Sequence, residues 1–479
     1  VLRQREHVVW SLYAKALANL TEDKRCVVLE AEVDVPVRRR LGAPFTQEVA
    51  LPLLLEVGRR QLARVRRLRA EAPDRRADAH EHHEDEHSEE DLGYINNSDF
   101  AVDATKFGVS KVTDWGYIGF GIDNLEKRSV LRPNGLRQSV RVEPVGVALG
   151  LTPWNFPAFL PARKLAPALA AGCSMILKAS EETPGTAVSL IRALSDAGVP
   201  DGVVNLVFGV PAEISEKLFA STIVRKISFT GSVPVGKQLA GLASSGLKRC
   251  TFELGGHSPA IVCEDANLEN ALSTLTAFKF RNSGQVCIAP SRFFVHRSHY
   301  NSFVNGFVDA SHSQCLGNGL EEETTMGPMS NYRRIESMGN LVQDAVKCGA
   351  KLVTGGKRWG NVGFFWEPTV LVDVPDHSKI MQEEPFGPVA PIIPFDSLDE
   401  VIEKSNSLQY GLASYVFTQS DNTRELLVNS LESGGIAFNS AAPVPSDLPY
   451  GGLKDSGYGY EGGIEGVEAY LHKKLVSLE

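Results

Sequence analysis

The sequence lacks the features of several protein classes. Its 479 residues contain no apolar run near the ~20 residues that a membrane-spanning helix needs. The opening residues, VLRQREHVVW, lack the apolar segment of a secretory signal. The net charge is −9, whereas nucleic-acid-binding domains usually carry a basic face. These absences predict a soluble, cytoplasmic protein that binds neither nucleic acid nor a membrane.

The cysteines also lack a pattern. There are seven of them, with no CxxC pair and no dense framework. Scattered thiols in odd number are typical of a reducing compartment, where cysteines stay free. Most such cysteines are small buried apolar residues. A reactive cysteine therefore has to be identified from its neighbours.

From about residue 137 onward, strand-like and helix-like segments alternate. Apolar strands such as 174–178 and 224–229 are separated by longer helical stretches. Crossover connections of this kind build a parallel sheet, so the pattern predicts a doubly wound α/β fold. A second series of strands runs from residue 260 to residue 418, which places a domain boundary near residue 254.

The first 136 residues form an atypical region. Arginine is frequent between residues 25 and 76, and residues 80–91 read HEHHEDEHSEED. That run offers many metal ligands but no apolar flank to order them, so a solvated, mobile stretch around 75–92 is favoured over a metal site, and no metal is expected. One hypothesis is that part of this region is out of its ancestral reading frame. Finding no better continuation in the other frames of the coding DNA would contradict it.

Three short motifs carry candidate chemistry. FRNSGQVC ends in Cys287, and its glycine allows a substrate and a backbone N–H to approach a thiol closely. A nucleophilic thiol also needs surroundings that favour the thiolate, a base and oxyanion donors. ELGG places Glu253 at a strand end, and TPWNFP holds Asn155 in a rigid turn that suits an oxyanion donor. Taken singly, Glu253 could be a surface residue before a turn, and Asn155 part of a capped turn.

Taken together, the motifs are specific. TPWNFP, FTGS, ELGG, GQVC and EEPFGP occur in this order in one chain. They resemble the aldehyde dehydrogenase superfamily over residues 137–479, and most closely its succinate-semialdehyde dehydrogenases. The resemblance implies a Rossmann-type cofactor domain (137–254, completed by residues 1–136), an α/β catalytic domain (255–440), and a C-terminal return with a small oligomerisation β-arm (441–479).

The resemblance also assigns the catalytic roles. Cys287 attacks the aldehyde carbon, the thiohemiacetal gives hydride to the cofactor, and water hydrolyses the thioester. Asn155 and the Cys287 backbone N–H hold the oxyanion, and Glu253 is the general base. Family members that transfer the acyl group to coenzyme A typically lack this glutamate, so its presence disfavours an acyl-transferring reductase.

No GxGxxG motif marks the cofactor site. The resemblance implies a looser turn, in which Gly231, Ser232 and Gly236 present a helix N-terminus to the pyrophosphate. Glu181 can accept bonds from both ribose hydroxyls but would repel a 2′-phosphate, so NAD is favoured over NADP. A helix-capping role for Glu181 is compatible with the same residues. The other residues that the resemblance places against the cofactor are Trp154, Lys178, Gly209, Leu254, Glu384 and Phe386.

Two arginines indicate the substrate. Arg163 follows the TPWNFP turn, and Arg281 precedes Cys287 by a few residues. In succinate-semialdehyde dehydrogenases, arginines at both places bind the substrate carboxylate, with help from a serine that Ser446 would supply. The alternatives are ion pairs of these arginines within the protein, a dehydrogenase for other aliphatic or aromatic aldehydes, and a protein that keeps the fold without turnover.

Assembly is implied by the same resemblance. A homodimer or homotetramer is expected. The strand near Leu136–Val142 and the C-terminal Tyr470–Leu478 would pair across subunits.

Overall fold

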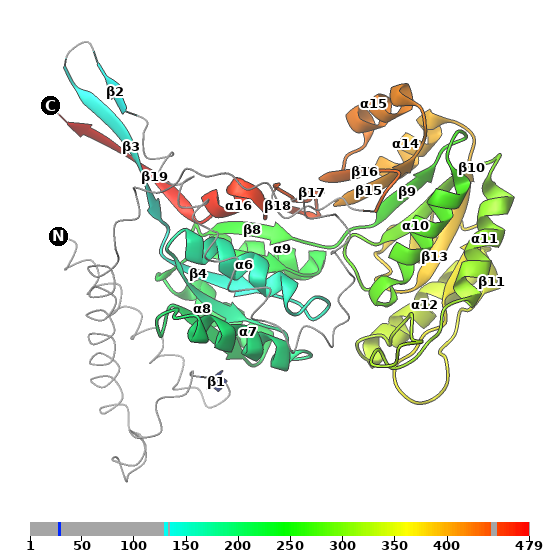
Figure 1. Cartoon of the computed structure of the whole chain (residues 1–479), viewed down its shortest axis with the longest axis horizontal. Coiled ribbons are helices and arrows are strands. Elements are labelled where there is room, and N and C mark those ends of the chain that lie inside the picture. Colours follow the sequence, from blue (N-terminus) through cyan, green and yellow to red (C-terminus); the bar gives the residue numbers. More distant parts are fainter. Residues whose placement is uncertain (1–26, 30–128, 133–134, 442–447, 479) are drawn as a thin grey trace, which may run out of the picture.

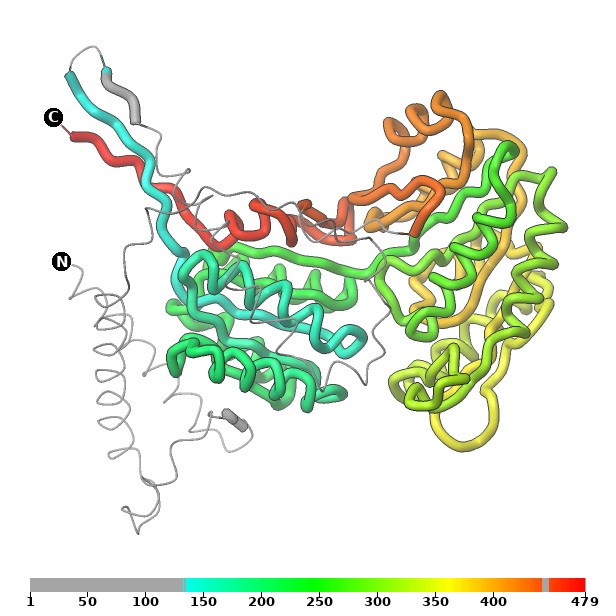
Figure 2. Tube along the Cα trace, in the orientation of Figure 1, coloured from blue at the N-terminus to red at the C-terminus, as the bar shows by residue number. Residues whose placement is uncertain are grey.

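The computed structural model describes residues 27–29, 129–132, 135–441 and 448–478. They form two α/β lobes that lie side by side, and a narrow arm of strands projects from the first lobe (Figure 1). The trace in Figure 2 builds the first lobe, passes into the second, and returns across the first lobe to the arm. The site residues of both lobes therefore have to meet at the junction of the lobes.

The first lobe is a seven-stranded sheet in the order β1-β6-β5-β4-β7-β8-β18. The inner strands β6, β5, β4, β7 and β8 are parallel to one another. The edge strands β1 and β18 are antiparallel to their neighbours. Helices α8 and α9 pack on one face, and α6, α7 and α16 on the other. The strands are β1 (Val27–Leu29), β4 (Val147–Leu151), β5 (Ser174–Lys178), β6 (Val204–Phe208), β7 (Val224–Thr230), β8 (Arg249–Glu253) and β18 (Gly457–Tyr458). The helices are α6 (Phe159–Ala170), α7 (Pro184–Asp196), α8 (Pro211–Ala220), α9 (Val233–Ser244) and α16 (Gly463–Glu468).

The second lobe is a seven-stranded sheet in the order β11-β12-β13-β10-β9-β15-β16, parallel except at β11. Alternate side chains of β10 enter the cores on opposite faces, which α10 and α11 cover on one side and α12 to α15 on the other. The strands are β9 (Ser258–Val262), β10 (Pro290–His296), β11 (Lys351–Thr354), β12 (Thr369–Val372), β13 (Val389–Phe395), β15 (Ala413–Phe417) and β16 (Gly435–Phe438). The helices are α10 (Leu268–Phe280), α11 (Tyr300–His312), α12 (Tyr332–Cys348), α13 (Lys379–Gln382), α14 (Leu398–Asn406) and α15 (Asp421–Ser430). The short strands β14 (Tyr410–Gly411) and β17 (Leu453–Lys454) pair beside the lobes.

The predicted fold class is confirmed. The strand and helix alternation after residue 137 forms a Rossmann-type sheet and a second α/β sheet, and the chain changes sheets between β8 and β9. The apolar run 142–151 is divided, because Gly146 (φ +111°) separates β4 from the end of an arm strand. The domain boundaries stay predictions, and the atypical stretches at 25–76 and 80–91 lie almost wholly outside the described residues. No helix in the described ranges has the length and apolarity to cross a bilayer.

The arm is built from distant segments of the chain. It is a sheet in the order β19-β3-β2, made of β2 (Ser129–Leu131), β3 (Arg137–Pro144) and β19 (Leu471–Leu478). Pairing across subunits stays a prediction, and within one chain these two strands pair antiparallel with each other. The reason is local, because α16 brings the chain back to the base of β3, where Val145 N–H donates to the Tyr470 carbonyl at 2.9 Å.

The C-terminal return depends on one glycine. Gly457 has φ +134°, and a Cβ there would overlap the carbonyl oxygen of Phe252 in β8. We expect Gly457→Ala to destabilise the protein by about 2–4 kcal/mol, because backbone strain and a backbone clash coincide. Thermal melting followed by circular dichroism measures this as a lowered midpoint. Gly241→Ala, inside α9 with nothing within 4 Å of a new Cβ, is the matched control and should hold or raise the midpoint. Equal midpoints for the two variants would contradict the prediction.

Candidate active site

The predicted site residues of the first lobe follow the carboxyl ends of adjacent parallel strands. Asn155 follows β4, Lys178 ends β5, Ser232 follows β7 and Glu253 ends β8. Gly209 (φ +148°) follows β6 at the same edge. Strand order reverses beside β4, and open α/β sheets bind ligands at such a point.

Cys287 lies in a loop of the second lobe, between α10 and β10. The approach to it is strained, since Asn282 and Ser283 both have positive φ, 49° and 55°. Side chains hold this conformation against the segment 327–330. The Ser283 hydroxyl donates to a carbonyl of that segment at 2.6 Å, and the Gln285 side chain accepts from one of its amides at 2.8 Å. These two hydrogen bonds therefore hold the loop of Cys287, which we call the nucleophile loop, against residues 327–330.

Two glycines allow the lobes to meet. A Cβ on Gly255 would overlap the carboxylate of Glu384, and a Cβ on Gly256 would lie 2.9 Å from the carbonyl oxygen of Cys287. The Gly256 N–H faces an oxygen of Glu384 at 3.4 Å. The ELGG motif thus brings Glu253, Glu384 and the Cys287 loop into one neighbourhood.

Asn155 bonds to the nucleophile loop across the lobes. Its Nδ2 donates to the carbonyl of Gln285 at 3.1 Å, and Asn282 donates to the carbonyl of Asn155 at 3.1 Å. The Asn155 Oδ1 is buried and has no partner among the described residues. Because an amide nitrogen carries two hydrogens, one donor of Asn155 stays available beside the loop of Cys287.

Burial dominates the electrostatics of the two reactive groups. Burial, followed by the charges of Glu384 and Glu253, raises the pKa of the Cys287 thiol to about 12. Burial and the neighbouring Glu461 raise the pKa of Glu253 well above its usual range, although Lys164 and Arg163 oppose this. Backbone hydrogen bonds from Ile288 and Cys287 act in the other direction but are outweighed, so the surroundings favour the thiol over the thiolate and the thiol needs a proton acceptor.

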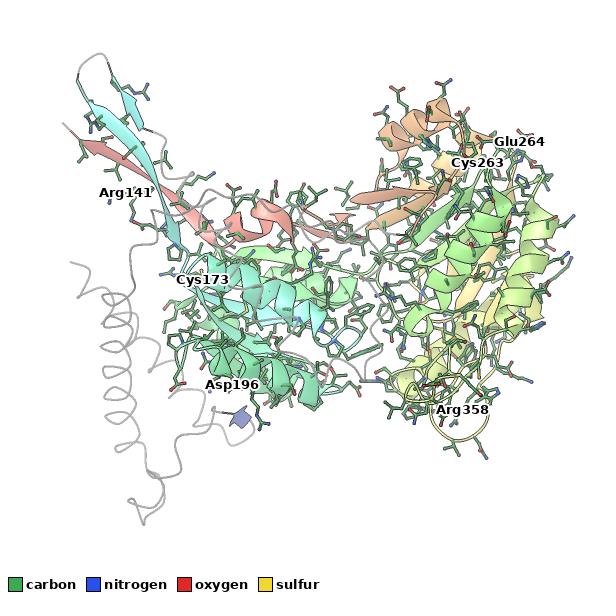
Figure 3. The ribbon with its side chains drawn as sticks, in the orientation of Figure 1. Arg141, Cys173, Asp196, Cys263, Glu264 and Arg358 are labelled. Atoms are coloured by element: carbon green, nitrogen blue, oxygen red, sulfur yellow. The ribbon has the colours of Figure 1, made fainter. Side chains whose placement is uncertain are left out.

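The pKa does not distinguish Cys287 from other cysteines. Burial also raises the pKa of the Cys263 thiol to about 12, and it raises that of Cys173. Figure 3 shows these two in separate lobes, each within its own sheet layer. Cys287 differs in position, since only its loop, among the cysteines that the structure describes, bonds to Asn155 and packs on the ELGG glycines.

Two charged residues near Glu253 were not singled out from the sequence. Lys164 is fully buried, and its Nζ donates to Glu461 at 2.6 Å and to the Thr230 hydroxyl at 2.8 Å. Glu461 also accepts from the Ser228 hydroxyl at 3.1 Å. A signal existed for Lys164, which shares the buried face of α6 with Leu160 and Ala168 at helical spacing. Glu461 gave no comparable signal.

The pyrophosphate turn fits a dinucleotide. A Cβ on Gly236 would lie 2.5 Å from the side chain of Leu254, so α9 packs there only with glycine. Gly231 is similarly tight against Phe229. Ser232 is the N-cap of α9 but makes no capping side-chain bond, which leaves N–H groups of the first turn for an anion.

The adenosine side carries an exposed carboxylate. Glu181 accepts from Lys178 Nζ at 2.6 Å, and the Glu181 side chain is 56% exposed. Burial works against its ionisation, but the Lys178 bond and the charges of Lys178 and Arg333 outweigh it, so the pKa of Glu181 is lowered. A negative charge therefore faces the place expected for the ribose.

At the place expected for the nicotinamide, an aromatic pair lies beside a half-buried acid. The rings of Trp154 and Phe386 meet edge to face, with centroids 5.6 Å apart. Arg334 donates to the carbonyls of Pro385 (2.6 Å) and Phe386 (3.0 Å) and so holds this loop. Burial raises the pKa of Glu384 to about 8.

The two arginines have different surroundings. Arg163 Nε lies 3.7 Å from the carboxylate of Glu461, yet its Nη2 is buried without a partner among the described residues. The Arg281 guanidinium lies 5.4 Å from the ring centroid of Phe156, in the turn that carries Asn155. Arg163 is therefore partly paired within the protein. Ser446, the third substrate residue expected, lies outside the described residues.

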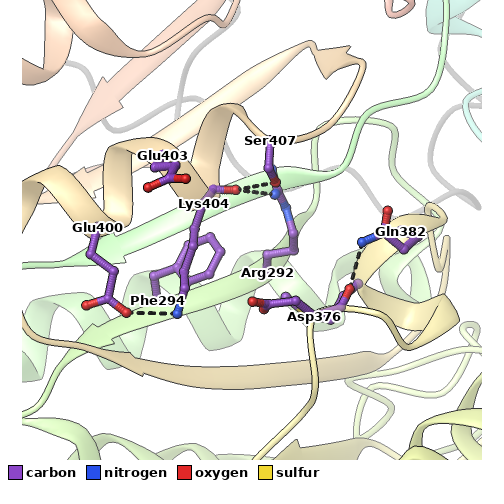
Figure 4. A pocket seen from close by; sticks show the side chains of 9 residues that line it. Arg292, Phe294, Asp376, Gln382, Glu400, Glu403, Lys404 and Ser407 are labelled. Carbon is purple, nitrogen blue, oxygen red and sulfur yellow. Dashed lines mark hydrogen bonds and ion pairs between the residues drawn. The ribbon is translucent and has the colours of Figure 1, made fainter.

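A cavity of about 300 Å³ lies in the second lobe (Figure 4) and contains none of the predicted site residues. Arg292 projects into it, but the carbonyls of His257, Lys404 and Ser405 already occupy its guanidinium at 2.9 Å each. No cluster of metal-ligating side chains is found in the part of the chain that the structure describes. The junction of the lobes remains the best candidate site.

The comparisons with known proteins agree with this geometry. The model of the aldehyde dehydrogenase family matches residues 96–476, which extends upstream of the expected residue 137. The chain belongs to the aldehyde dehydrogenase family.

Its relatives are named for different substrates. A putative 4-(hydroxymethyl)benzenesulfonate dehydrogenase of Comamonas testosteroni is 47% identical over 72% of this chain and 71% of its own length. A 3-sulfolactaldehyde dehydrogenase of Pseudomonas putida is 43% identical over 71% and 70%. A mitochondrial succinate-semialdehyde dehydrogenase of Arabidopsis thaliana is 42% identical over 71% and 65%. The family is thus shown, and the substrate is not.

Solved aldehyde dehydrogenases share the fold. A succinate-semialdehyde dehydrogenase from Burkholderia pseudomallei has a TM-score of 0.75 at 35% identity over 79% of this chain and 81% of that one. An NAD⁺ complex from Bacillus cereus has a TM-score of 0.75 at 36% identity over 79% of each chain. An NADP-dependent enzyme of Escherichia coli has a TM-score of 0.75 at 34% identity over 79% and 82%. Both cofactors therefore occur on this fold.

The raised thiol pKa predicts how Cys287 reacts. Because the pKa of the Cys287 thiol is raised to about 12, the reactive thiolate is a small fraction between pH 7 and 9 and grows roughly tenfold per pH unit. Alkylation of Cys287 by iodoacetamide should therefore accelerate roughly tenfold per pH unit over this range. Mass spectrometry of the Cys287 peptide gives the rate, and the exposed Cys315 in the same sample checks access of the reagent. A rate that levels off below pH 8 would contradict the prediction.

Proposed function

We propose that this aldehyde dehydrogenase oxidises an aldehyde that carries an anionic group to the corresponding acid, with NAD. The observation that carries the proposal is the placement of the Cys287 loop against Asn155 and the ELGG glycines, with Arg163 and Arg281 on the elements beside it. The bound cofactor supplies hydride acceptance. The protein supplies the nucleophile, the oxyanion donors and the base.

The chemical steps follow from the side chains. The Cys287 thiol gives its proton to a base and its sulfur bonds to the aldehyde carbon, while Asn155 Nδ2 and the Cys287 N–H stabilise the oxygen that becomes negative. After hydride leaves, Glu253 removes a proton from water, which attacks the thioester and frees the thiol. A carboxylate whose pKa is raised by burial accepts that proton closer to neutral pH than an exposed one does.

The arginines favour an anionic aldehyde. Arg281 makes no ion pair with any described acid and packs over Phe156, so its charge is available to a ligand. Arg163 contributes a buried nitrogen without a partner. A carboxylate can take such forks in two-pronged hydrogen bonds, so a semialdehyde such as succinate semialdehyde is the leading substrate.

A sulfonated aldehyde is the second candidate. Relatives named for 4-(hydroxymethyl)benzenesulfonate and 3-sulfolactaldehyde are 47% and 43% identical to this chain. A sulfonate is also an oxyanion with several acceptor oxygens, so the same arginines suit it. Other aliphatic or aromatic aldehydes would leave the buried Nη2 of Arg163 without a partner, which costs free energy.

The wider setting is part of the proposal. The protein acts on a small molecule, assembles as a homodimer or homotetramer through its arm, and works in the cytoplasm. Its domains are 1–136 with 137–254 for the cofactor, 255–440 for catalysis, and 441–479 for the return and the arm.

Substrate choice can be measured by NADH absorbance with succinate semialdehyde, 3-sulfolactaldehyde and the neutral butanal. We expect the unaltered protein to prefer the anionic aldehydes and Cys287→Ala to be inactive. Arg281→Ala should lower kcat/KM for the preferred anion by a factor equivalent to about 2–4 kcal/mol of transition-state stabilisation, because a charge-assisted pair is lost. It should change butanal oxidation little.

Arg281→Ala is the cleaner arginine variant, since Arg163→Ala also removes a neighbour of Glu461. Equal rates on all three aldehydes would defeat the anion-binding argument. No turnover of any aldehyde would favour a protein that keeps the fold without catalysis.

Glu181 provides a test of the cofactor. Its charge opposes a 2′-phosphate, so Glu181→Ser should raise the ratio of kcat/KM with NADP to that with NAD by roughly tenfold. Glu216→Gln, which removes an exposed charge from α8 of the same lobe, is the control and should leave the ratio unchanged. An unchanged ratio in Glu181→Ser would contradict a role in cofactor choice and indicate that Glu181 only stabilises its loop.

A further inference from the structure

The segment of residues 327–334, which we call the junction segment, leads into the first turn of α12 and contacts three loops of the site. Its first half bonds to Ser283 and Gln285 in the nucleophile loop. Arg334 holds the loop of Glu384 and Phe386 through two carbonyls. These contacts lie within the second lobe.

The third contact crosses between the lobes. Glu182, in the loop after β5, accepts from Asn331 Nδ2 at 2.9 Å and from Arg333 at 3.1 Å. Glu182 directly follows Glu181, whose carboxylate faces the place expected for the adenosine ribose. The junction segment therefore joins the adenosine-side loop to the nicotinamide-side loop.

Asn331 has two separate roles in this arrangement. Its Oδ1 accepts from the Arg334 N–H at 3.3 Å and caps α12, while its Nδ2 reaches Glu182. The interlobe bond can break without unfolding either lobe, because Arg333 is 80% exposed and Glu182 is 30% exposed. The contact thus joins the two lobes at the protein surface, where it can form and break.

We infer that the junction segment is a clamp that holds the two cofactor loops at a fixed separation and limits how fast the dinucleotide leaves. Asn331 and Arg333 are positioning residues that act through Glu182. The inference rests on the proposed function, since it takes the dinucleotide to lie between Lys178 on one lobe and Glu384 on the other.

Stopped-flow fluorescence tests the clamp through NADH dissociation, without turnover. Unlabelled NAD in excess displaces prebound NADH from the full-length protein. Asn331→Asp keeps the capping oxygen but puts a carboxylate against Glu182. We expect it to preserve the melting temperature, because Asp caps helices as well as Asn does, and to release NADH roughly three- to tenfold faster.

The rescue variant separates a clamp from other effects. Asn331→Asp combined with Glu182→Gln exchanges donor and acceptor, so the interlobe hydrogen bond forms again, and the dissociation rate should return toward that of the unaltered protein. Glu336→Gln, an exposed charge on the same helix, is the matched control and should release NADH at the unaltered rate.

Two results would overturn the clamp: an unchanged dissociation rate in Asn331→Asp, or a faster rate that Glu182→Gln does not restore. Failure of the unaltered protein to bind NADH at all would instead contradict the proposed function, and the clamp with it. The two failures are therefore distinguishable.

Discussion

The close approach of the two lobes at Gly255 and Gly256 is the constraint on which the site depends. Glu253 ends a strand of the first sheet, and the next two residues must let the Cys287 main chain and the Glu384 carboxylate come against them. A side chain at either position would force its neighbour to shift, the Glu384 carboxylate at Gly255 or the Cys287 main chain at Gly256. Cys287, Glu253 and Glu384 therefore come close together where two residues without side chains follow Glu253.

This approach also sets the electrostatics. Bringing Glu253, Glu384 and Cys287 together buries Glu253 and half-buries the other two, and burial is the largest cause of each raised pKa. Neutral forms are then favoured for the thiol and the carboxyls. Glu253 has to lose its proton before it can act as a base, and its charged neighbours act in opposite directions, since Glu461 raises its pKa and Lys164 lowers it.

The sequence predicts features that depend on neighbouring residues, such as strands and turns. It does not predict features that depend on contacts between distant segments of the chain. Strand 174–178 and the turn at Gly231 follow from apolar patterning and from glycine, which act over a few residues. The pairing of the two arm strands within one chain was not predicted, because contacts between residues over three hundred positions apart depend on how α16 turns the chain back. The junction segment had no signal at all, because Asn331 and Arg333 are ordinary helix-start residues until Glu182 is placed opposite them.

The buried polar atoms that lack partners indicate where ligands belong. Folded proteins leave few such atoms, because each costs free energy. Among the described residues, several of them surround the junction of the lobes: Thr152 Oγ1, Asn155 Oδ1, Arg163 Nη2, Glu253 Oε1 and Arg334 Nε. Four of them come from the first lobe, in the loop after β4, in α6 and at the end of β8, and Arg334 Nε comes from α12 of the second lobe. Both donors and acceptors are present, which suits an anionic substrate, a water and a dinucleotide more than one apolar ligand. A site that is incomplete in this way is stabilised by what it binds, since binding supplies the missing hydrogen bonds.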